Sequence, residues 1–288
     1  MSRLTRILVV SLAVLSPAGA TVPARDEPPW PDETALLADI LENQNQVEQA
    51  REAYTYTMTV TDLKRGSRGD GVRGTARTYE VFHVAGKQFR KLTAKDGQPL
   101  KPDEALKEEG RVAKAVREHR GQHSRQEAAT QPGAGEPGDD DVTPSDVLRL
   151  CRLVNPRREE FRGQAAIVYV FEPRPGALPR GRAESWIART GGRAWVDEQA
   201  RRLLRLEVQV KRALKVGGGL LMSVGPGSSL VFEQALVNEE VWLPTYAEIE
   251  VSARLLLLKG VKQHQEIRFS DYRKFSVETS EDVRASQR

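Results

Sequence analysis

Strict alternation of apolar and polar residues constrains this chain more than any other feature. In one stretch Ala247, Ile249, Val251, Ala253, Leu255 and Leu257 alternate with Glu248, Glu250, Ser252 and Arg254. Successive side chains of a β-strand point to opposite faces, so this stretch predicts a long strand with one apolar face. Residues 239–260 as a whole far exceed the usual ~5–6 residues of a strand. An apolar face of that length needs a cover.

The same period of two recurs in both halves of the chain. Residues 54–63, 75–84 and 87–95 predict a first meander that closes at the turn of residues 96–99. Further strands are predicted at 164–173, 182–190, 193–197, 201–213, 229–237, 239–260 and 261–278, with a Gly-rich reversal at 216–228. Turns at roughly 8–14-residue intervals are typical of antiparallel connections.

Helical signals occupy three other segments. Residues 33–52 place Leu37, Ile40, Leu41 and Val47 on one helical face. Residues 102–123 predict a charged helix, and the Gly-, Pro- and Gln-rich residues 124–141 predict a flexible loop. Thr143 and Pro144 resemble a helix N-terminus and predict a short helix at 144–152.

This order of elements predicts an α+β fold that is mainly antiparallel β. The strands outnumber what a flat open sheet holds comfortably, so we expect a strongly curved open β-barrel, or half-barrel, with helices covering the concave face. One domain would span residues 33–278, with a flexible insertion at about 124–142. A Pro-rich lead-in at 21–32 and a polar tail at 279–288 flank it.

The N-terminus has the layout of a secretory signal peptide over residues 1–20. Two arginines precede an apolar run at residues 7–15, and small residues follow at 18–20. That run is far shorter than the ~20 residues that span a bilayer. We therefore expect an exported, soluble chain with no integral membrane span after signal removal.

Charge and cysteine content argue against a nucleic-acid-binding protein and against a disulfide-stabilised one. Without the two signal arginines, the chain has 42 basic residues (44 − 2) against 40 acidic ones, so its balance does not point to nucleic acid. Cys151 is the single cysteine, so no internal disulfide can form, and it is expected to be a small core residue. Stability must come from the packed core.

The candidate catalytic and metal motifs do not complete a site. His119 and His123 lie four apart, but Arg120 stands where a zinc protease needs glutamate. The acidic run 139–141 lacks the glycine and closing glutamate of a calcium loop. The Gly-rich segment 217–229 lies between strands, whereas a phosphate loop opens a helix. The sequence thus predicts no enzyme, no cofactor and no metal.

What the pattern does predict is a hydrophobic cavity between the curved sheet and its helices. Its expected lining is Tyr54, Tyr56, Met58, Val60, Leu204, Leu206, Val208, Val210, Ile249, Val251 and Leu255, with Val147, Leu148 and Leu150 as a lid. The alternative is that helices fill this space and these residues are ordinary core. Both interpretations stay open at this point.

Four stretches resemble the LolA/LolB-like periplasmic lipoprotein-carrier superfamily. They are "YTYTMTVTDL" after the first helix, "GGRAWVDEQARRLLRLEVQVK", "VWLPTYAEIEV" and "EIRFSDYRKF". The resemblance covers most of residues 33–278 and implies an unclosed barrel whose helical lid covers a cavity for acyl chains. The chain departs from the family in its insertion at 102–142, and no arginine can be matched to the family's mouth arginine.

The resemblance implies a periplasmic protein that carries an acyl chain, lipid or lipoprotein for outer-membrane lipoprotein sorting or lipid trafficking. The alternative is an envelope sensor or adaptor that recognises a lipidated ligand through its cavity and a protein partner through residues 102–123. The partners would be acyl chains and possibly an envelope or outer-membrane protein, with no nucleic acid.

Overall fold

In the computed structural model, the alternating segments form the strands of a single sheet. The model describes residues 28–65, 72–129, 149–176, 182–216, 222–255 and 259–274. The predicted signal peptide and polar tail therefore lie outside the described residues, as do most residues of the first unit of the chain, 1–30. All the elements below belong to the second unit, residues 31–288.

The strands are β1 (Tyr54–Arg65), β2 (Val72–Val84), β3 (Lys87–Lys95), β4 (Gln98–Pro99), β5 (Cys151–Phe161), β6 (Gln164–Pro173), β7 (Thr190–Asp197), β8 (Leu203–Val210), β9 (Leu214–Val216), β10 (Met222–Val224), β11 (Ser229–Val237), β12 (Val241–Leu255) and β13 (Lys259–Lys274). They pair in the order β4-β3-β2-β1-β13-β12-β11-β8-β7-β6-β5, and β10 joins β12 to β9. The paired strands are antiparallel. β4 and β5 end the series and do not pair with each other, so the sheet is open, as predicted.

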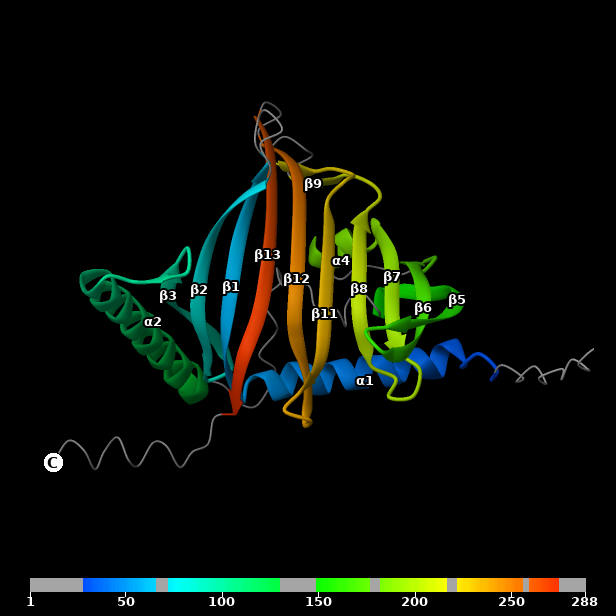
Figure 1. Cartoon of the computed structure of the whole chain (residues 1–288), viewed down its shortest axis with the longest axis horizontal. Coiled ribbons are helices and arrows are strands. Elements are labelled where there is room, and N and C mark those ends of the chain that lie inside the picture. The colour runs from blue at the N-terminus through cyan, green and yellow to red at the C-terminus, as the bar shows by residue number, and fades with distance from the viewer. Residues whose placement is uncertain are drawn as a thin grey trace, which may run out of the picture. The chain divides into compact units, whose positions relative to one another are not determined.

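The helices are α1 (Glu33–Arg51), α2 (Pro102–Ala129) and α4 (Arg182–Ile187). Asp32 caps α1, because its carboxylate accepts a hydrogen bond from the Ala35 N–H at 2.9 Å. Figure 1 shows α1 crossing behind the strands, and its buried residues pack on the half of the sheet from β5 to β8. We call the face that α1 contacts the inner face and the opposite one the outer face.

One predicted strand is wrong. Residues 182–190 contain the short helix α4, and β7 begins only at Thr190. Gly191 and Gly192 therefore lie inside β7 and do not form the turn that two adjacent glycines suggest. A side chain at Gly192 would place its Cβ 1.7 Å from the Glu207 carbonyl oxygen, so the close approach of β8 requires glycine there.

The predicted elements between residues 124 and 152 also need correction. α2 continues to Ala129, so the predicted loop begins later than its composition suggests, and residues 130–148 lie outside the described part. The helix predicted at 144–152 is wrong at its end. Residues 149–150 are helical, but β5 begins at Cys151 and pairs with β6 along its length. A tertiary partner strand overrides the local helical pattern there.

The open edges of the sheet are covered by helix side chains. Beside β3, Glu108 of α2 accepts a hydrogen bond from the Leu92 N–H at 2.7 Å, and Arg111 donates to the Arg90 carbonyl at 2.8 Å. Beside β5, Glu33 of α1 accepts from the Leu153 N–H at 3.0 Å. Unpaired edge groups are a template for aggregation. The helix predicted at 102–123 thus protects an edge, which differs from the expectation that it covers the concave face.

The predicted fold class is confirmed: the chain is α+β, with an open, mainly antiparallel sheet and helices against it. Among the residues that the structure describes, no helix is both long enough and apolar enough to cross a membrane.

Candidate functional site

A continuous apolar row runs across the inner face through seven strands. Residues directly opposite each other in antiparallel strands share a face. The pairing register places Val60, Ile267, Ala247, Phe232, Leu206, Ala194 and Tyr169 side by side from β1 to β6. A parallel row holds Ile249, Leu230, Val208, Gly192, Phe171 and Leu153. Strand parity alone thus creates a wide apolar surface.

The part of this surface between β5 and β8 is packed core. Leu36, Leu37 and Ile40 of α1 contact it, and Ile187 of α4 belongs to the same buried cluster. Polar anchors hold α1 in place there. Asn43 donates a hydrogen bond to the Arg201 carbonyl at 3.0 Å, in the turn before β8.

Toward β1, β12 and β13 part of the inner face is only half-buried, although Tyr56, Met58 and Ala247 there are buried. Its half-buried apolar side chains there are Val60, Val210, Ile249, Val251 and Ile267, together with Trp186 of α4, and we call this set the inner strip. Trp186, Val210 and Val251 pack around the buried pair Val224 and Ala253 at one end of the strip. The inner strip is apolar surface that the described residues leave incompletely covered.

The predicted cavity lining therefore divides into two groups. Leu204, Leu206 and Val208 are buried in clusters that include residues of α1. Tyr54, Tyr56 and Met58 are also buried. Val60, Val210, Ile249 and Val251 belong to the inner strip.

Of the predicted lid, Leu150 is buried in the same cluster as α1, so it is part of the core beside β5. Val147 and Leu148 lie outside the described part of the chain, and so does the side chain of Leu255, which belongs to the predicted cavity lining.

A polar cluster beside the inner strip was not singled out by sequence reasoning. Asp62 of β1 accepts hydrogen bonds from Arg77 of β2 at 2.8 Å and from Gln265 of β13 at 2.6 Å. Asp62 shares a face with Val60, Arg77 lies opposite Val60, and Gln265 lies opposite Ile249. A charged residue at an apolar parity position is the sequence signal that could have indicated this cluster. The cluster of Asp62, Arg77 and Gln265 gives the apolar surface a polar border.

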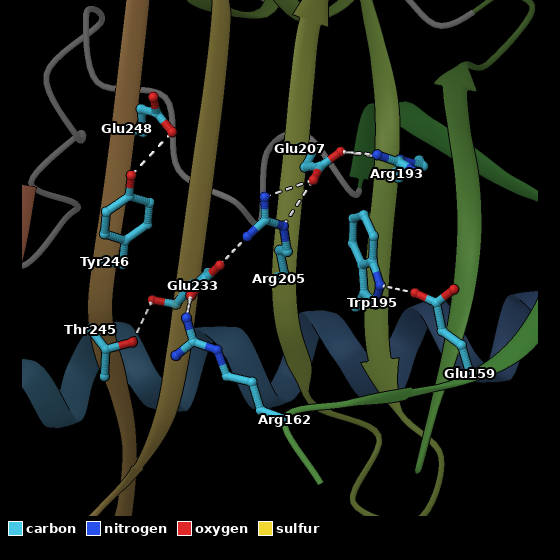
Figure 2. Close-up of polar contacts among 10 residues, drawn as sticks. All are labelled: Glu159, Arg162, Arg193, Trp195, Arg205, Glu207, Glu233, Thr245, Tyr246 and Glu248. Carbon is cyan, nitrogen blue, oxygen red and sulfur yellow. Dashed lines mark hydrogen bonds and ion pairs between the residues drawn. The ribbon is translucent and has the colours of Figure 1, made fainter. Parts of the chain in front are cut away.

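The outer face carries a chain of charged and aromatic side chains, drawn in Figure 2. Glu207 accepts from Arg193 at 2.6 Å and from Arg205 at 2.9 Å, and Arg205 also pairs with Glu233. Burial disfavours the charged form of Glu207, but the hydrogen bonds from Arg193 and Arg205 outweigh it and lower the pKa of its carboxyl group. This part of the outer face therefore holds a network of paired charges around Trp195 (Figure 2).

The lone thiol lies in the packed half. Cys151 is fully buried, and that burial raises its pKa to about 12. A thiol held in the neutral form is a poor nucleophile. Within the described ranges, no group of three or more His, Cys, Asp or Glu side chains is placed to hold a metal ion.

The described residues form at least three pockets beside the sheet. The largest of the three, about 930 Å³, lies between α2, the start of β1 and the end of β2, and Tyr54, Phe82, Val84 and Val112 contribute its apolar wall. A second, of about 480 Å³, lies between α2 and β3. The third, of about 500 Å³, borders β6, β7 and β8. Of the predicted cavity lining, Tyr54 borders the largest pocket.

No family model matches the sequence, and a search of curated proteins finds no match. Among solved structures, the chain is similar to a LolA superfamily protein from Nitrosomonas europaea, at 9% identity and a TM-score of 0.34, over 85% of this chain and 94% of that one.

A domain assigned to outer membrane lipoprotein sorting, from Vibrio parahaemolyticus, matches at 12% identity and a TM-score of 0.34, over 84% and 94% of the two chains. A DUF1329 family protein from Desulfovibrio piger matches at 14% identity and a TM-score of 0.36, over 85% and 94%.

Proposed function

We propose that this protein is a periplasmic carrier that binds an acyl chain of a lipid or lipoprotein on the inner strip. The observation that carries this proposal is that α1 buries only part of the apolar inner face of the sheet. Apart from Val210 at the end of β8, α1 and the cluster around it bury the apolar residues from β5 to β8, whereas Val60, Ile249, Val251 and Ile267 on the same face are half-buried. A carrier needs apolar surface that a ligand can reach without unfolding the core.

Binding would rest on burial alone. Each CH₂ group removed from water contributes about 0.8 kcal/mol, so a chain of a dozen carbons supplies enough energy to offset the cost of association. A reversible carrier needs no covalent step, which fits a lone thiol that is buried and neutral. The Asp62–Arg77–Gln265 cluster would lie beside the polar end of such a ligand.

The packed half of the sheet would act as a rigid support. α1 is attached to the β7–β8 turn by Asn43 and to β5 by Glu33. Leu150, predicted as part of a lid, is instead buried with α1. We therefore expect the ligand to enter and leave on the side of β1 and β13, where the apolar surface is less covered.

The test is a titration of the purified protein with a fluorescent fatty acid, comparing two adjacent substitutions on β12. Val251→Lys places a charge on the inner strip, whereas Ser252→Lys places the same charge on the outer face of the same strand. We expect uptake of the probe by the parent and by Ser252→Lys. Affinity should fall by roughly tenfold or more in Val251→Lys, because the ammonium group must be desolvated beside the acyl chain.

A third variant, Val84→Lys, places the charge in the 930 Å³ pocket under α2. If Val84→Lys abolishes uptake and Val251→Lys does not, the ligand lies under α2 and the inner strip is not the site. A parent protein that ignores the probe, and carries no lipid detectable by mass spectrometry, would contradict the carrier function itself.

A further inference from the structure

The pocket of about 500 Å³ beside β6, β7 and β8 has a distinct chemistry. It is bordered by backbone at Gly191 and Gly192 and by the basic residues Arg189, Arg193, Lys211 and Arg212. Arg193, which lies on its border, projects from the outer face in Figure 2, away from α1. We call it the cationic pocket. It is separate from the inner strip, which lies on the opposite face.

Two of its arginines hold neighbouring segments together in a reciprocal way. Arg189 donates a hydrogen bond to the Ala213 carbonyl at 2.7 Å, and Arg212 donates to the Ala188 carbonyl at 3.1 Å. The backbone N–H of Lys211 also donates to the Arg189 carbonyl at 2.9 Å. Residues far apart in sequence thus bring three positive side chains to one wall.

Charge in the pocket is not balanced by its own carboxylates. Glu172 is paired with Arg152, and Glu207 is paired with Arg193 and Arg205. Within the described ranges, Arg189 and Arg212 bond to backbone carbonyls and Lys211 to the amide oxygen of Gln209, so none of the three has a carboxylate partner. Like charges held together repel one another, and an anion between them would remove that repulsion.

The volume of the pocket, and not the space directly over Gly191, leaves room for such an anion. Gly191 has no side chain, and the Lys211 stem lies above it, with Cε 3.7 Å from where a Cβ would stand. A volume of about 500 Å³ falls in the range of small-molecule sites. A carboxylate would neutralise one of three positive charges, whereas a phosphate monoester carries nearly two negative charges at neutral pH and several strong acceptor oxygens.

The geometry points to a second binding site, in the cationic pocket, for a phosphate ester. The phosphate would lie beside the basic wall and accept hydrogen bonds from Lys211, Arg189 and Arg212. Val170, which is unusually exposed for a valine, lies on the border of the pocket and would contact the organic part of the ligand. The phosphate could belong to a free phosphomonoester or to a lipid whose head group is a phosphomonoester, such as phosphatidic acid.

The test is isothermal titration of the purified protein with phenyl phosphate and, as the neutral counterpart, phenol. Lys211→Gln is the main variant, because the Lys211 side chain bonds only to the exposed Gln209 and its loss should leave the fold intact. Lys107→Gln on α2, outside the pocket, is the control of equal charge change. We expect phenyl phosphate but not phenol to bind, with affinity at least about tenfold weaker in Lys211→Gln and unchanged in Lys107→Gln.

Vesicles then separate the two sources of phosphate. Co-sedimentation with phosphatidylcholine vesicles that contain phosphatidic acid, but not with pure phosphatidylcholine vesicles, and its loss in Lys211→Gln would assign the site to a lipid head group. Binding of phenyl phosphate without co-sedimentation would assign it to a free phosphomonoester. The proposed site is wrong if neither phenyl phosphate nor the anionic vesicles bind, or if phenol binds as tightly as phenyl phosphate. It is also wrong if Lys107→Gln weakens the binding of phenyl phosphate as much as Lys211→Gln does.

Discussion

The carboxylate of Glu108 on α2 accepts a hydrogen bond from the backbone N–H of Leu92 on β3 at 2.7 Å. Arg111 donates to the same carboxylate at 2.7 Å and to the Arg90 carbonyl at 2.8 Å. The hydrogen bond from Arg111 lowers the pKa of Glu108 against the opposing effect of burial. A charged helix therefore supplies both an acceptor and a donor to an edge strand that would otherwise be open to other chains.

Removing this cover should make the protein associate through β3. We expect the double variant Glu108→Ala with Arg111→Ala to form concentration-dependent oligomers, measured by size-exclusion chromatography with light scattering. Glu118→Ala with Lys114→Ala removes an exposed ion pair of the same helix and should remain like the parent. Equal behaviour of the two double variants would show that α2 does not protect the edge.

A buried amide pair joins α1 to the sheet. Gln234 of β11 donates to Gln44 at 3.3 Å and to the Leu203 carbonyl at 2.6 Å, and both glutamines are buried. Gln234→Leu should lower the free energy of unfolding by roughly 1–3 kcal/mol, because the Leu203 carbonyl loses this donor. Gln44→Leu should cost less, since Gln234 keeps its bond to Leu203. Urea unfolding of both single variants and the double variant measures their coupling, which is zero if the pair is not formed.

The two arginines that pair with Glu233 should contribute unequally to stability. The Glu233 side chain is 2% exposed, whereas that of Arg205 is 24% exposed and that of Arg162 is 63% exposed. Arg205→Ala should cost about 2–4 kcal/mol, because it leaves a buried carboxylate with only the exposed partner. Arg162→Ala should cost about 1 kcal/mol or less. Chemical denaturation measures both, and equal losses would contradict this ranking.

Acid should destabilise the outer-face network through Glu207. Its pKa is lowered in the folded protein, so the unfolded chain binds a proton first as the pH falls. The stabilisation is complete above the ordinary glutamate pKa and is lost as the pH drops from that value through the depressed one. Thermal unfolding from pH 7 to pH 3 should show a shallower acid loss for Glu207→Gln than for the parent. If the melting temperatures of Glu207→Gln and of the parent fall equally between pH 7 and pH 3, Glu207 does not contribute to the acid sensitivity.

The Cys151 thiol should not react in the folded state. It is fully buried, with a pKa raised to about 12, so thiolate is scarce at neutral pH. Ellman's reagent should therefore label the protein only at the rate of unfolding, and labelling should become rapid in denaturant. Rapid labelling of the native protein would show that the α1–β5 region opens locally.

The period of two in this sequence was sufficient to predict most of the sheet. The predicted limits of residues 87–95, 164–173 and 229–237 match β3, β6 and β11, because alternation is a local property of one strand. The helix α1 was also predictable from its spacing. Its buried Gln44 was not explained by that spacing, because its partner Gln234 is distant in sequence.

Where prediction failed, long-range contacts had decided the structure. β5 begins at Cys151, inside the helix predicted at 144–152, because β6 pairs with it, and Gly191 and Gly192 lie within a strand because β8 passes close to Gly192. Likewise, parity placed Leu206 and Ile249 on the same apolar face, but only the position of α1 buries one fully and leaves the other half-exposed. The sequence thus determined which residues face inward. The tertiary structure decided which of them remain available to a ligand, because cover depends on packing between elements far apart in the chain.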